Sequence, residues 1–495
     1  MSAYANLKRH FNRIGTLAEI DAMLSWDMET TMPVGAQESR AEQVALLEPH
    51  IHALTREPHL EDWLQAAEAE SLEDLSRANL REMRRRWVHA TAVPDDLVDA
   101  FSRARSKCSM VWRRAREEDN FQVVQPYLEE VIHLTRLQGE ARAQALGVST
   151  YDALLDGYDP DASEASIAVL FDELGAFLPD LTQEIIAAQR AQTPPLPTQG
   201  HFPAEGQKRV ARRVMAMLGF DFNNGRLDES IHPFCGGIPD DVRITTRYDE
   251  EDFFFGLLGV VHETGHALYE QGLPIAWRRL PGGSARSMTL HESQSLLYEM
   301  QLGCGLEFLT QLEPLLREEL GLEGATWSAH NLHRVATRVE PGLIRIRADE
   351  VTYPSHVVLR FRLERAMIRG ELEVADLPGA WREGMRELLG IAPQTDSDGV
   401  LQDIHWYEGL IGYFPTYTLG ALSAAQLFEA AGRDLAVADG IRQGDFEPLK
   451  LWLRRFVHQH GALRSGEDIL AQATGRPLDT RAFRAHLERR YLGRA

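Results

Sequence analysis

The sequence predicts a mainly α-helical protein with a small β-sheet. Through residues 1–192, which are rich in Ala, Leu, Glu and Arg, apolar side chains recur every three or four positions, as in amphipathic helices. The same pattern returns at residue 252 and continues to the C-terminus. Between these parts, the segment DVRITTRY at 241–248 alternates β-branched residues with charged or polar ones, which predicts a short strand.

The clearest helix of the N-terminal part is predicted for residues 162–192. Its apolar residues share one face of a helical wheel: Ile167, Leu170, Phe171, Leu174, Phe177 and Leu178. The Pro-rich segment 193–203 (TPPLPTQGHFP) follows it and is the clearest linker signal in the chain. We therefore expect a helical N-terminal part up to residue 192 and a second part from residue 204.

Composition and charge exclude several classes of protein. The chain has 495 residues, of which 44% are hydrophobic and 25% charged, as in ordinary globular proteins. Its formal net charge of -22 makes nucleic acid an unsuitable partner, and no apolar run approaches the roughly 20 residues of a membrane span. Three widely spaced cysteines and an N-terminus without the apolar core of a secretory signal predict a cytoplasmic protein.

Residues 253–274 (FFFGLLGVVHETGHALYEQGLP) are predicted to form a helix that carries a metal site. Acidic residues at 249–252 suit its N-terminus, and a Gly and a Pro near 272–274 provide its end. His262 and His266 are four residues apart, so both imidazoles project from one face and can bind the same ion. Glu263 lies beside them, where it can take a proton from a water that the metal activates. The alternative is a pair of histidines that are only hydrogen-bonded in a partly buried helix.

A catalytic zinc site needs a third protein ligand, and the extended HExxHxxGxxH pattern is absent here. Glu292 follows His266 by 26 residues, in the sequence HESQS at 291–295, and opens another helix with periodic apolar residues. From spacing alone, Glu292 is either this ligand or the acidic member of a capping box with Thr289.

HETGH followed by HESQS at this distance resembles the M32 metallocarboxypeptidases, the carboxypeptidase Taq family. The resemblance extends over nearly the whole chain. The other motifs that carry it are LSWDMETTMP at 24–33, SRAEQ at 39–43, YDALLDGYDP at 151–160, HPF at 232–234, DVRIT at 241–245, ADEVTYPSH at 348–356, GVLQDIHW at 399–406 and GYFPTYTLG at 412–420. The sequence departs from the family at Met28, where Gln is common, and at Arg347, where an acidic residue is usual.

This resemblance implies a zinc-dependent carboxypeptidase of broad specificity, which releases single amino acids from the free C-terminus of peptides. It implies that Glu292 is the third metal ligand beside His262 and His266. The ligand set suits Zn²⁺, with Co²⁺ as a substitute. The fold implied is a single peptidase domain over 1–495, of the gluzincin type found in neurolysin and angiotensin-converting enzyme. In it, residues 1–192 wall a deep substrate groove and 204–495 carry the zinc site, with the small sheet beside the substrate. A homodimer is also implied.

Catalytic roles follow from the chemistry of peptide hydrolysis. Glu263 is expected to act as the general base and then to protonate the leaving amine. The oxyanion needs a hydrogen-bond donor besides the metal, and Tyr417 and His405, in downstream family motifs, are the candidates. Asp403 is a candidate to orient a neighbouring imidazole. For Tyr417 and His405 the alternative is that each is a buried, hydrogen-bonded core residue.

An exopeptidase of this kind must also recognise a free α-carboxylate, for which a guanidinium group is the natural partner. Arg243, on the predicted strand, and Arg345, beside ADEVTY, are the best candidates. Because Arg347 stands where the family usually has an acidic residue, the sequence leaves open whether Arg345 or Arg347 faces the substrate. His232 and Tyr353 are further candidates for substrate binding.

Two other functions remain as alternatives. A metal-dependent endo-oligopeptidase shares the HExxH motif, the glutamate ligand and the helical groove, and differs in that cleavage needs no free C-terminus. A non-catalytic, zinc-stabilised binding protein is the second alternative. Glu263 argues against it, because a structural zinc site has no use for a base. Cys235 follows HPF without an adjacent base and is interpreted as a small buried hydrophobe.

Overall fold

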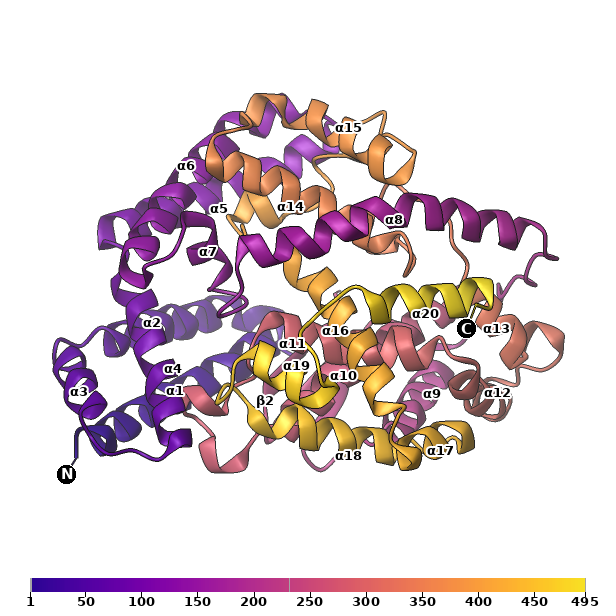
Figure 1. The fold of residues 1–495 in the computed structure, drawn as a ribbon, viewed down its shortest axis with the longest axis horizontal. Coiled ribbons are helices and arrows are strands. Elements are labelled where there is room, and N and C mark those ends of the chain that lie inside the picture. The colour runs from indigo at the N-terminus through magenta and orange to yellow at the C-terminus, as the bar shows by residue number, and fades with distance from the viewer. Residues whose placement is uncertain (1, 231, 495) are drawn as a thin grey trace. The chain divides into compact units, whose positions relative to one another are not determined.

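The computed structural model of the protein describes residues 2–230 and 232–494. They are mostly helical, as Figure 1 shows. The described residues group into two compact units. Unit 1 comprises 1–90, 195–336 and 420–478, and unit 2 comprises 91–194, 337–419 and 479–495. The expected single peptidase domain over 1–495 stays a prediction.

Unit 1 contains the predicted HExxH helix, α10 (Phe253–Gly272), and the helix that follows it, α11 (Met288–Leu296), which continues as a π-helix, η4 (Leu297–Gly303). The start and end of α10 agree with the sequence prediction. The other helices of this unit are α1 (Ala3–Glu29), α2 (Gln37–Thr55), α3 (His59–Glu68), α4 (Asp74–Thr91), α9 (Ala204–Met217), α12 (Leu306–Leu320), α13 (Ala329–Ala336), α16 (Pro415–Ala431, divided between the units at Gly420), α17 (Leu435–Gln443), α18 (Glu447–Phe456) and α19 (Gly466–Thr474).

Unit 2 is built around long helices, and α8 (Glu164–Arg190) runs beside α14 (Tyr353–Arg369) and α20 (Arg481–Leu492), as Figure 1 shows. The predicted helix at 162–192 is therefore confirmed. Ile167, Phe171 and Leu174 on its apolar face are buried, because that face packs against the rest of the unit. The remaining helices are α5 (Asp95–Glu117), α6 (Phe121–Leu146), α7 (Thr150–Leu155) and α15 (Leu377–Leu389).

Unit 1 also contains a three-stranded sheet in the order β1-β3-β2. The predicted strand is β3 (Asp241–Thr246), which pairs in parallel with β1 (Gly225–Glu229) and antiparallel with β2 (Cys235–Ile238). Val242 and Ile244 are buried against α10, as the alternation predicted. The strand ends two residues earlier than predicted, and Thr245 is buried on the face expected to be polar, because its hydroxyl bonds to Ser230 and Phe234.

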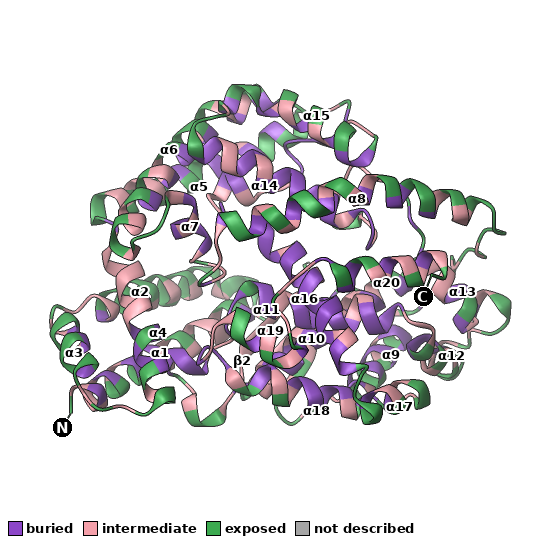
Figure 2. Cartoon of the chain, viewed as in Figure 1, coloured by how far each residue is buried: buried purple, intermediate pink, exposed green. Residues whose placement is uncertain are grey.

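The main core of unit 1 surrounds α10. Figure 2 shows this helix almost entirely purple or pink, and Phe255 is its single exposed residue. Its apolar residues Phe254, Leu257 and Val261 belong to a cluster that also includes residues of α9, α12 and α18. A helix buried on nearly all sides holds its polar residues in place, and His262 and His266 are partly buried there.

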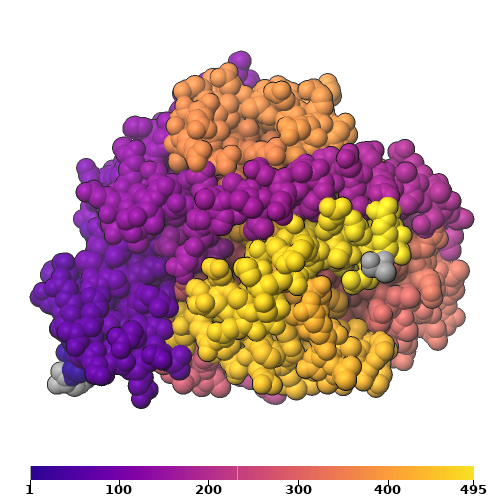
Figure 3. Space-filling view, viewed as in Figure 1, coloured from indigo at the N-terminus to yellow at the C-terminus, as the bar shows by residue number. Residues whose placement is uncertain are grey.

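A second, smaller core holds α1, α3 and α4 together. Leu7 and Phe11 of α1 pack with Leu60 and Leu64 of α3 in this cluster. The outer sides of these helices are exposed, and they form the indigo and purple surface at the lower left of Figure 3. Among the described residues, no helix combines the length and apolar character that crossing a membrane requires.

Candidate active site

Helices α10 and α11 approach each other closely at Gly265, between the two histidines of HETGH. A Cβ atom at Gly265 would come within 2.5 Å of the carbonyl oxygen of Gln294 and 2.7 Å of the Cα of Ser295. Only a residue without a side chain allows this approach. Glu292 itself meets Gly420 of α16, where a Cβ would come within 2.8 Å of the Cβ and Cγ of Glu292. Glycines on two neighbouring helices therefore fix the position of Glu292.

This packing brings the three predicted metal ligands together. The Nε2 atoms of His262 and His266 lie 3.9 Å and 3.5 Å from Oε2 of Glu292. One donor atom from each of the three side chains lies within 4.8 Å of the other two. A tetrahedral zinc ion with two nitrogen ligands and one oxygen ligand separates its donors by about 3.4 Å. The residues therefore fit a metal ion.

Glu299, on the π-helix, orients His262. Its Oε2 atom lies 2.7 Å from Nδ1 of His262. A carboxylate can only accept, so Nδ1 carries a proton and Nε2 is the nitrogen that a metal can bind. π-helical turns are rare and occur often at functional sites.

His291 and Glu270 orient His266 in a similar way. Nε2 of His291 lies 2.9 Å from Oε1 of Glu270, and Nδ1 of His291 lies 2.6 Å from Nδ1 of His266. Because Nε2 of His291 donates to Glu270, Nδ1 of the same ring is the nitrogen that faces His266. His266 then presents Nε2 towards Glu292.

The electrostatics of the cluster suit a divalent cation. Burial and the nearby His291 lower the pKa of His266 to about 4, so this ring is neutral. Burial opposes ionisation of Glu292, but its contact with His266 and the charge of His262 lower its pKa to about 2. Burial also acts to lower the pKa of His262, yet Glu299 and the other carboxylates raise it to about 10. The cluster therefore attracts positive charge, and metal ligands of these types must be deprotonated.

Glu263 has the properties of a general base. Burial raises its pKa to about 7, although the charge of His262 acts in the opposite direction. A carboxylate with a pKa near neutrality can both accept and return a proton at physiological pH. It follows His262 directly in the chain and so lies beside the predicted metal ligands.

The capping-box interpretation of Glu292 is wrong. The N-cap of α11 is Ser287, whose hydroxyl accepts a hydrogen bond from the backbone N–H of Leu290. Thr289 therefore lies within the helix, and Glu292 lies beyond the position that a capping box requires. Glu292 faces the two histidines instead.

Arg243 and His232 also belong to unit 1, but the structure does not bring them into one cluster with the metal ligands. The Nη2 atom of Arg243 lies 2.7 Å from Asp241, and its guanidinium group stacks 4.3 Å from the ring centre of Trp26. His232 is exposed, and its backbone carbonyl accepts a hydrogen bond from Ser230. Their assignment to substrate binding stays a prediction.

The other predicted substrate residues lie together in unit 2. Arg345 is buried and donates through Nη1 to the hydroxyl of Tyr353 at 2.9 Å and through Nη2 to Asp403 at 2.8 Å. Arg347 is exposed, so Arg345 is the arginine of this cluster. Asp403 also accepts from Arg360 at 2.7 Å. Burial acts to raise its pKa, but Arg360 and Arg345 hold the pKa of Asp403 well below its usual range. The expectation that Asp403 orients an imidazole is therefore corrected: it holds two guanidinium groups.

His405 and Tyr417 are neighbours in the same cluster. Nε2 of His405 lies 3.3 Å from the hydroxyl of Tyr417, and the guanidinium group of Arg345 lies 5.0 Å from the ring centre of Tyr417. Burial lowers the pKa of His405 to about 4, so its ring is neutral and carries one N–H. Five of the residues selected from sequence, Arg345, Tyr353, Asp403, His405 and Tyr417, thus form one polar cluster of unit 2.

Sequence reasoning missed Glu299, Glu270 and His291 as partners of the predicted metal ligands. Two of them, Glu270 and Glu299, could have been predicted from their spacing in the sequence. Glu270 follows His266 by four residues on the same helical face, and Glu299 follows Glu292 by seven, which is two turns. His291 precedes Glu292 directly, and its role required the packing of α10 on α11.

Comparison with known proteins agrees with this site. A family model described as carboxypeptidase Taq (M32) metallopeptidase matches residues 6–491. The chain belongs to this family.

Relatives of this M32 protein are carboxypeptidases. Thermostable carboxypeptidase 1 of Thermus thermophilus is 40% identical over 99% of this chain and 98% of its own length. Carboxypeptidase 1 of Bacillus subtilis is 34% identical over 97% of this chain and 96% of its own length. The protein is a metal-dependent carboxypeptidase, a hydrolase that acts on peptides.

Solved structures show the same fold. Metallocarboxypeptidase 1 of Trypanosoma cruzi has a TM-score of 0.96 at 40% identity, and a carboxypeptidase of Pyrococcus furiosus has a TM-score of 0.94 at 32% identity. Each comparison covers 99% of both chains. The mainly helical, gluzincin-like fold class expected from the sequence is confirmed.

Proposed function

We propose that this M32 protein is a zinc carboxypeptidase of broad specificity, in which His262, His266 and Glu292 hold the metal and Glu263 is the general base. The observation that carries the proposal is the convergence of two oriented Nε2 atoms on one carboxylate oxygen, at 3.9 Å and 3.5 Å. The nitrogen and oxygen donors suit Zn²⁺, and Co²⁺ is the substitute expected to support activity.

A zinc ion held there would lower the pKa of a water molecule and polarise the scissile carbonyl. Glu263 takes the proton of that water and passes it to the nitrogen of the leaving amino acid. Its pKa of about 7 supports both steps at neutral pH. Glu299 and His291 keep the two metal-ligating rings in the required tautomer while the proton moves.

The remaining assignments belong to the same proposal. Tyr417 and His405 supply hydrogen bonds to the oxyanion, which their mutual contact at 3.3 Å supports by holding both polar groups in one place. Tyr353 and either Arg345 or Arg243 recognise the end of the peptide, together with His232. Each guanidinium group has donors beyond those that its aspartate uses.

A homodimer in the cytoplasm completes the proposal. Cys108, Cys235 and Cys304 form no disulfide among the described residues, which supports a reducing compartment. Cys235 pairs in register with Ile244 on the neighbouring strand, and burial raises the pKa of its thiol. An unreactive thiol of this kind supports a packing role.

The experiment uses one N-acylated peptide, supplied as the free acid and as the C-terminal amide, with the products followed by mass spectrometry. We expect stepwise loss of C-terminal residues from the free acid only, and no cleavage in the presence of a chelator. Glu263→Gln should bind zinc normally and lose nearly all turnover, because the base is removed and the ligands remain. Glu251→Gln, at an exposed residue before the same helix, is the matched control and should keep full activity.

Internal cleavage of both peptide forms would favour the endo-oligopeptidase. Full activity of Glu263→Gln would contradict the assigned base. Cleavage that survives exhaustive removal of metal would contradict the zinc mechanism.

A further inference from the structure

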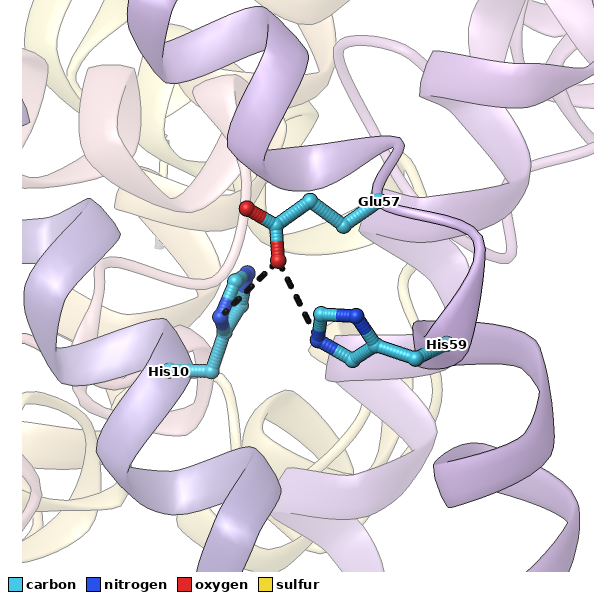
Figure 4. Close-up of side chains that lie close together, drawn as sticks. All are labelled: His10, Glu57 and His59. Atoms are coloured by element: carbon cyan, nitrogen blue, oxygen red, sulfur yellow. Dashed lines mark ion pairs between the residues drawn. The ribbon is translucent and has the colours of Figure 1, made fainter.

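A second group of two histidines and one glutamate lies in the N-terminal helices. His10 is on α1, Glu57 is in the turn after α2, and His59 is the first residue of α3. One donor atom from each lies within 4.8 Å of the other two, which is also true of the His262, His266 and Glu292 cluster. Figure 4 shows both imidazoles directed at the same carboxylate oxygen of Glu57.

The tautomer of His10 is fixed by the backbone. Nε2 of His10 lies 2.8 Å from the carbonyl oxygen of Leu54. A carbonyl only accepts, so Nε2 carries a proton and Nδ1 is the nitrogen left to bind a metal. Nδ1 lies 3.9 Å from Oε2 of Glu57. Two atoms that can each bind a cation therefore face each other. A histidine that donates to a backbone carbonyl from its other nitrogen is typical of metal ligands.

His59 presents a second nitrogen to the same point. Its Nε2 lies 3.1 Å from Oε2 of Glu57, and this nitrogen is inaccessible to solvent. Despite the short separation, the geometry of the two groups is not that of a hydrogen bond, and Nε2 has no hydrogen-bond partner. A metal ion explains a short separation without a hydrogen bond, because an ion bound to both atoms lies off the line that joins them.

The separations agree with tetrahedral coordination. Donors around a zinc ion with nitrogen and oxygen ligands are about 3.4 Å apart, and the two measured separations, 3.1 Å and 3.9 Å, bracket this value. The side chain of His10 is 10% exposed, whereas those of Glu57 and His59 are 35% and 41% exposed. Solvent therefore reaches one side of the cluster, where water can be a fourth ligand.

The surrounding residues hold the ligands in place. Trp63, one turn after His59, packs against the rings of both His59 and His10, with ring centres 4.1 Å and 6.2 Å apart. Glu57 and His59 are separated only by Pro58, whose φ of -57° is fixed by its ring. A backbone hydrogen bond from Leu60 to the carbonyl of Glu57 closes this turn. The three side chains thus have little freedom to move apart.

We propose that His10, Glu57 and His59 form a second metal site, which binds a divalent transition-metal ion such as Zn²⁺ and joins α1 to the α2–α3 turn. Its ligands come from α1, the turn after α2 and the start of α3, so a bound ion links segments that otherwise depend on the small core of Leu7, Phe11 and their neighbours. The role is structural, and the site is separate in sequence from the catalytic ligands.

The test counts metal ions in the full-length protein. Protein stripped with a chelator is reloaded with zinc chloride and dialysed, and the bound zinc is measured by plasma mass spectrometry. We expect two ions per chain in the unmodified protein, and one ion in His59→Ala, in Glu57→Gln and in Glu292→Ala. His50→Ala, at an exposed histidine of α2 outside the cluster, should retain two ions. His59→Ala should keep its peptidase activity.

Failure at either site is distinguishable. Two ions in both His59→Ala and Glu57→Gln, or a single ion in the unmodified protein that both variants retain, would overturn the second site. Two ions in Glu292→Ala would instead count against the catalytic ligand set. As an independent measurement, zinc should raise the melting temperature of Glu292→Ala, and adding His59→Ala to that variant should abolish the rise. An equal rise in both proteins would overturn the proposal.

Discussion

The close approach of α10 and α11 at Gly265 makes the replacement of this residue by alanine a direct test of how the metal site is built. The new Cβ would lie 2.5 Å from the carbonyl oxygen of Gln294, whereas an ordinary contact begins near 3.4 Å. Both atoms belong to the backbone or are attached rigidly to it, so no side chain can rotate to make room. The two helices would have to separate by about 1 Å at this point.

The Gly265→Ala substitution is expected to lower both the stability of the protein and its affinity for zinc. Overpacking of this kind destabilises proteins by about 1–3 kcal/mol, and the better helix propensity of alanine returns about 1 kcal/mol of that. The larger effect falls on Glu292, which precedes the displaced Ser295 by one turn on α11. A shift of the helix carries the carboxylate away from His262 and His266. Because loss of ligand support typically weakens metal binding 10–100-fold, we expect a drop of about this size in zinc affinity.

Competition with a chromogenic chelator measures the zinc affinity, and peptide hydrolysis at saturating zinc measures what activity remains. Gly259→Ala is the matched control, because Gly259 lies on the same helix and a Cβ there meets nothing within 4 Å. We expect this control to bind zinc normally and to be as stable as the unmodified protein or more so. If Gly265→Ala bound zinc with unchanged affinity, the close packing of the helices would not be what positions Glu292.

Three other predictions concern electrostatics and substrate recognition. Glu299→Gln should weaken zinc binding about 10–100-fold, because the ring of His262 loses its charged acceptor, while Glu307→Gln, at an exposed residue, should not; equal affinities in the two variants would contradict this. Burial raises the pKa of Glu364 to about 7 in the folded protein, above its ordinary value of 4.5 in the unfolded chain. A stabilisation of about 3 kcal/mol, fully present below pH 4.5, should therefore be lost as the pH rises to 7. Denaturant titrations should show that loss in the unmodified protein relative to Glu364→Gln, and parallel pH profiles would refute it. Replacing Arg345 or Arg243 by Gln should reduce hydrolysis of free-carboxylate peptides more than that of other substrates, and an equal reduction would indicate a structural role.

The parts of the fold that the sequence predicted well are those with strong local signals. The helix at 253–272 combined periodic apolar residues with clear start and end signals, and its bounds needed no tertiary information. The strand at 241–246 had β-branched alternation, but its partners had no such signal. β2 reads Cys-Gly-Gly-Ile and β1 reads Gly-Arg-Leu-Asp-Glu, so these strands exist because β3 offers them a backbone to pair with.

The site was predictable where chemistry depends on spacing and unpredictable where it depends on packing. Two histidines four apart on a helix converge whatever surrounds them. The choice between Ser287 and Thr289 as the helix cap, in contrast, depended on where the chain turned, and either residue type can serve. The choice between Arg345 and Arg347 depended on which one the fold buried, because both lie in one short turn.

The stretch 292–295 of α11 lies against two glycines from different parts of the chain: Gly265 meets Gln294 and Ser295, and Gly420 meets Glu292. The position of Glu292 therefore depends on the correct packing of α10 and α16 against α11. When a metal ion binds, part of the binding free energy also favours the packed arrangement of α10, α11 and α16, because binding to the folded form stabilises that form. The apo protein should consequently expose these three helices to hydrogen exchange and proteolysis together, as one cooperative segment, and zinc should protect them together. The metal ion that completes the predicted catalytic site would then also stabilise the packing of these three helices at the centre of unit 1.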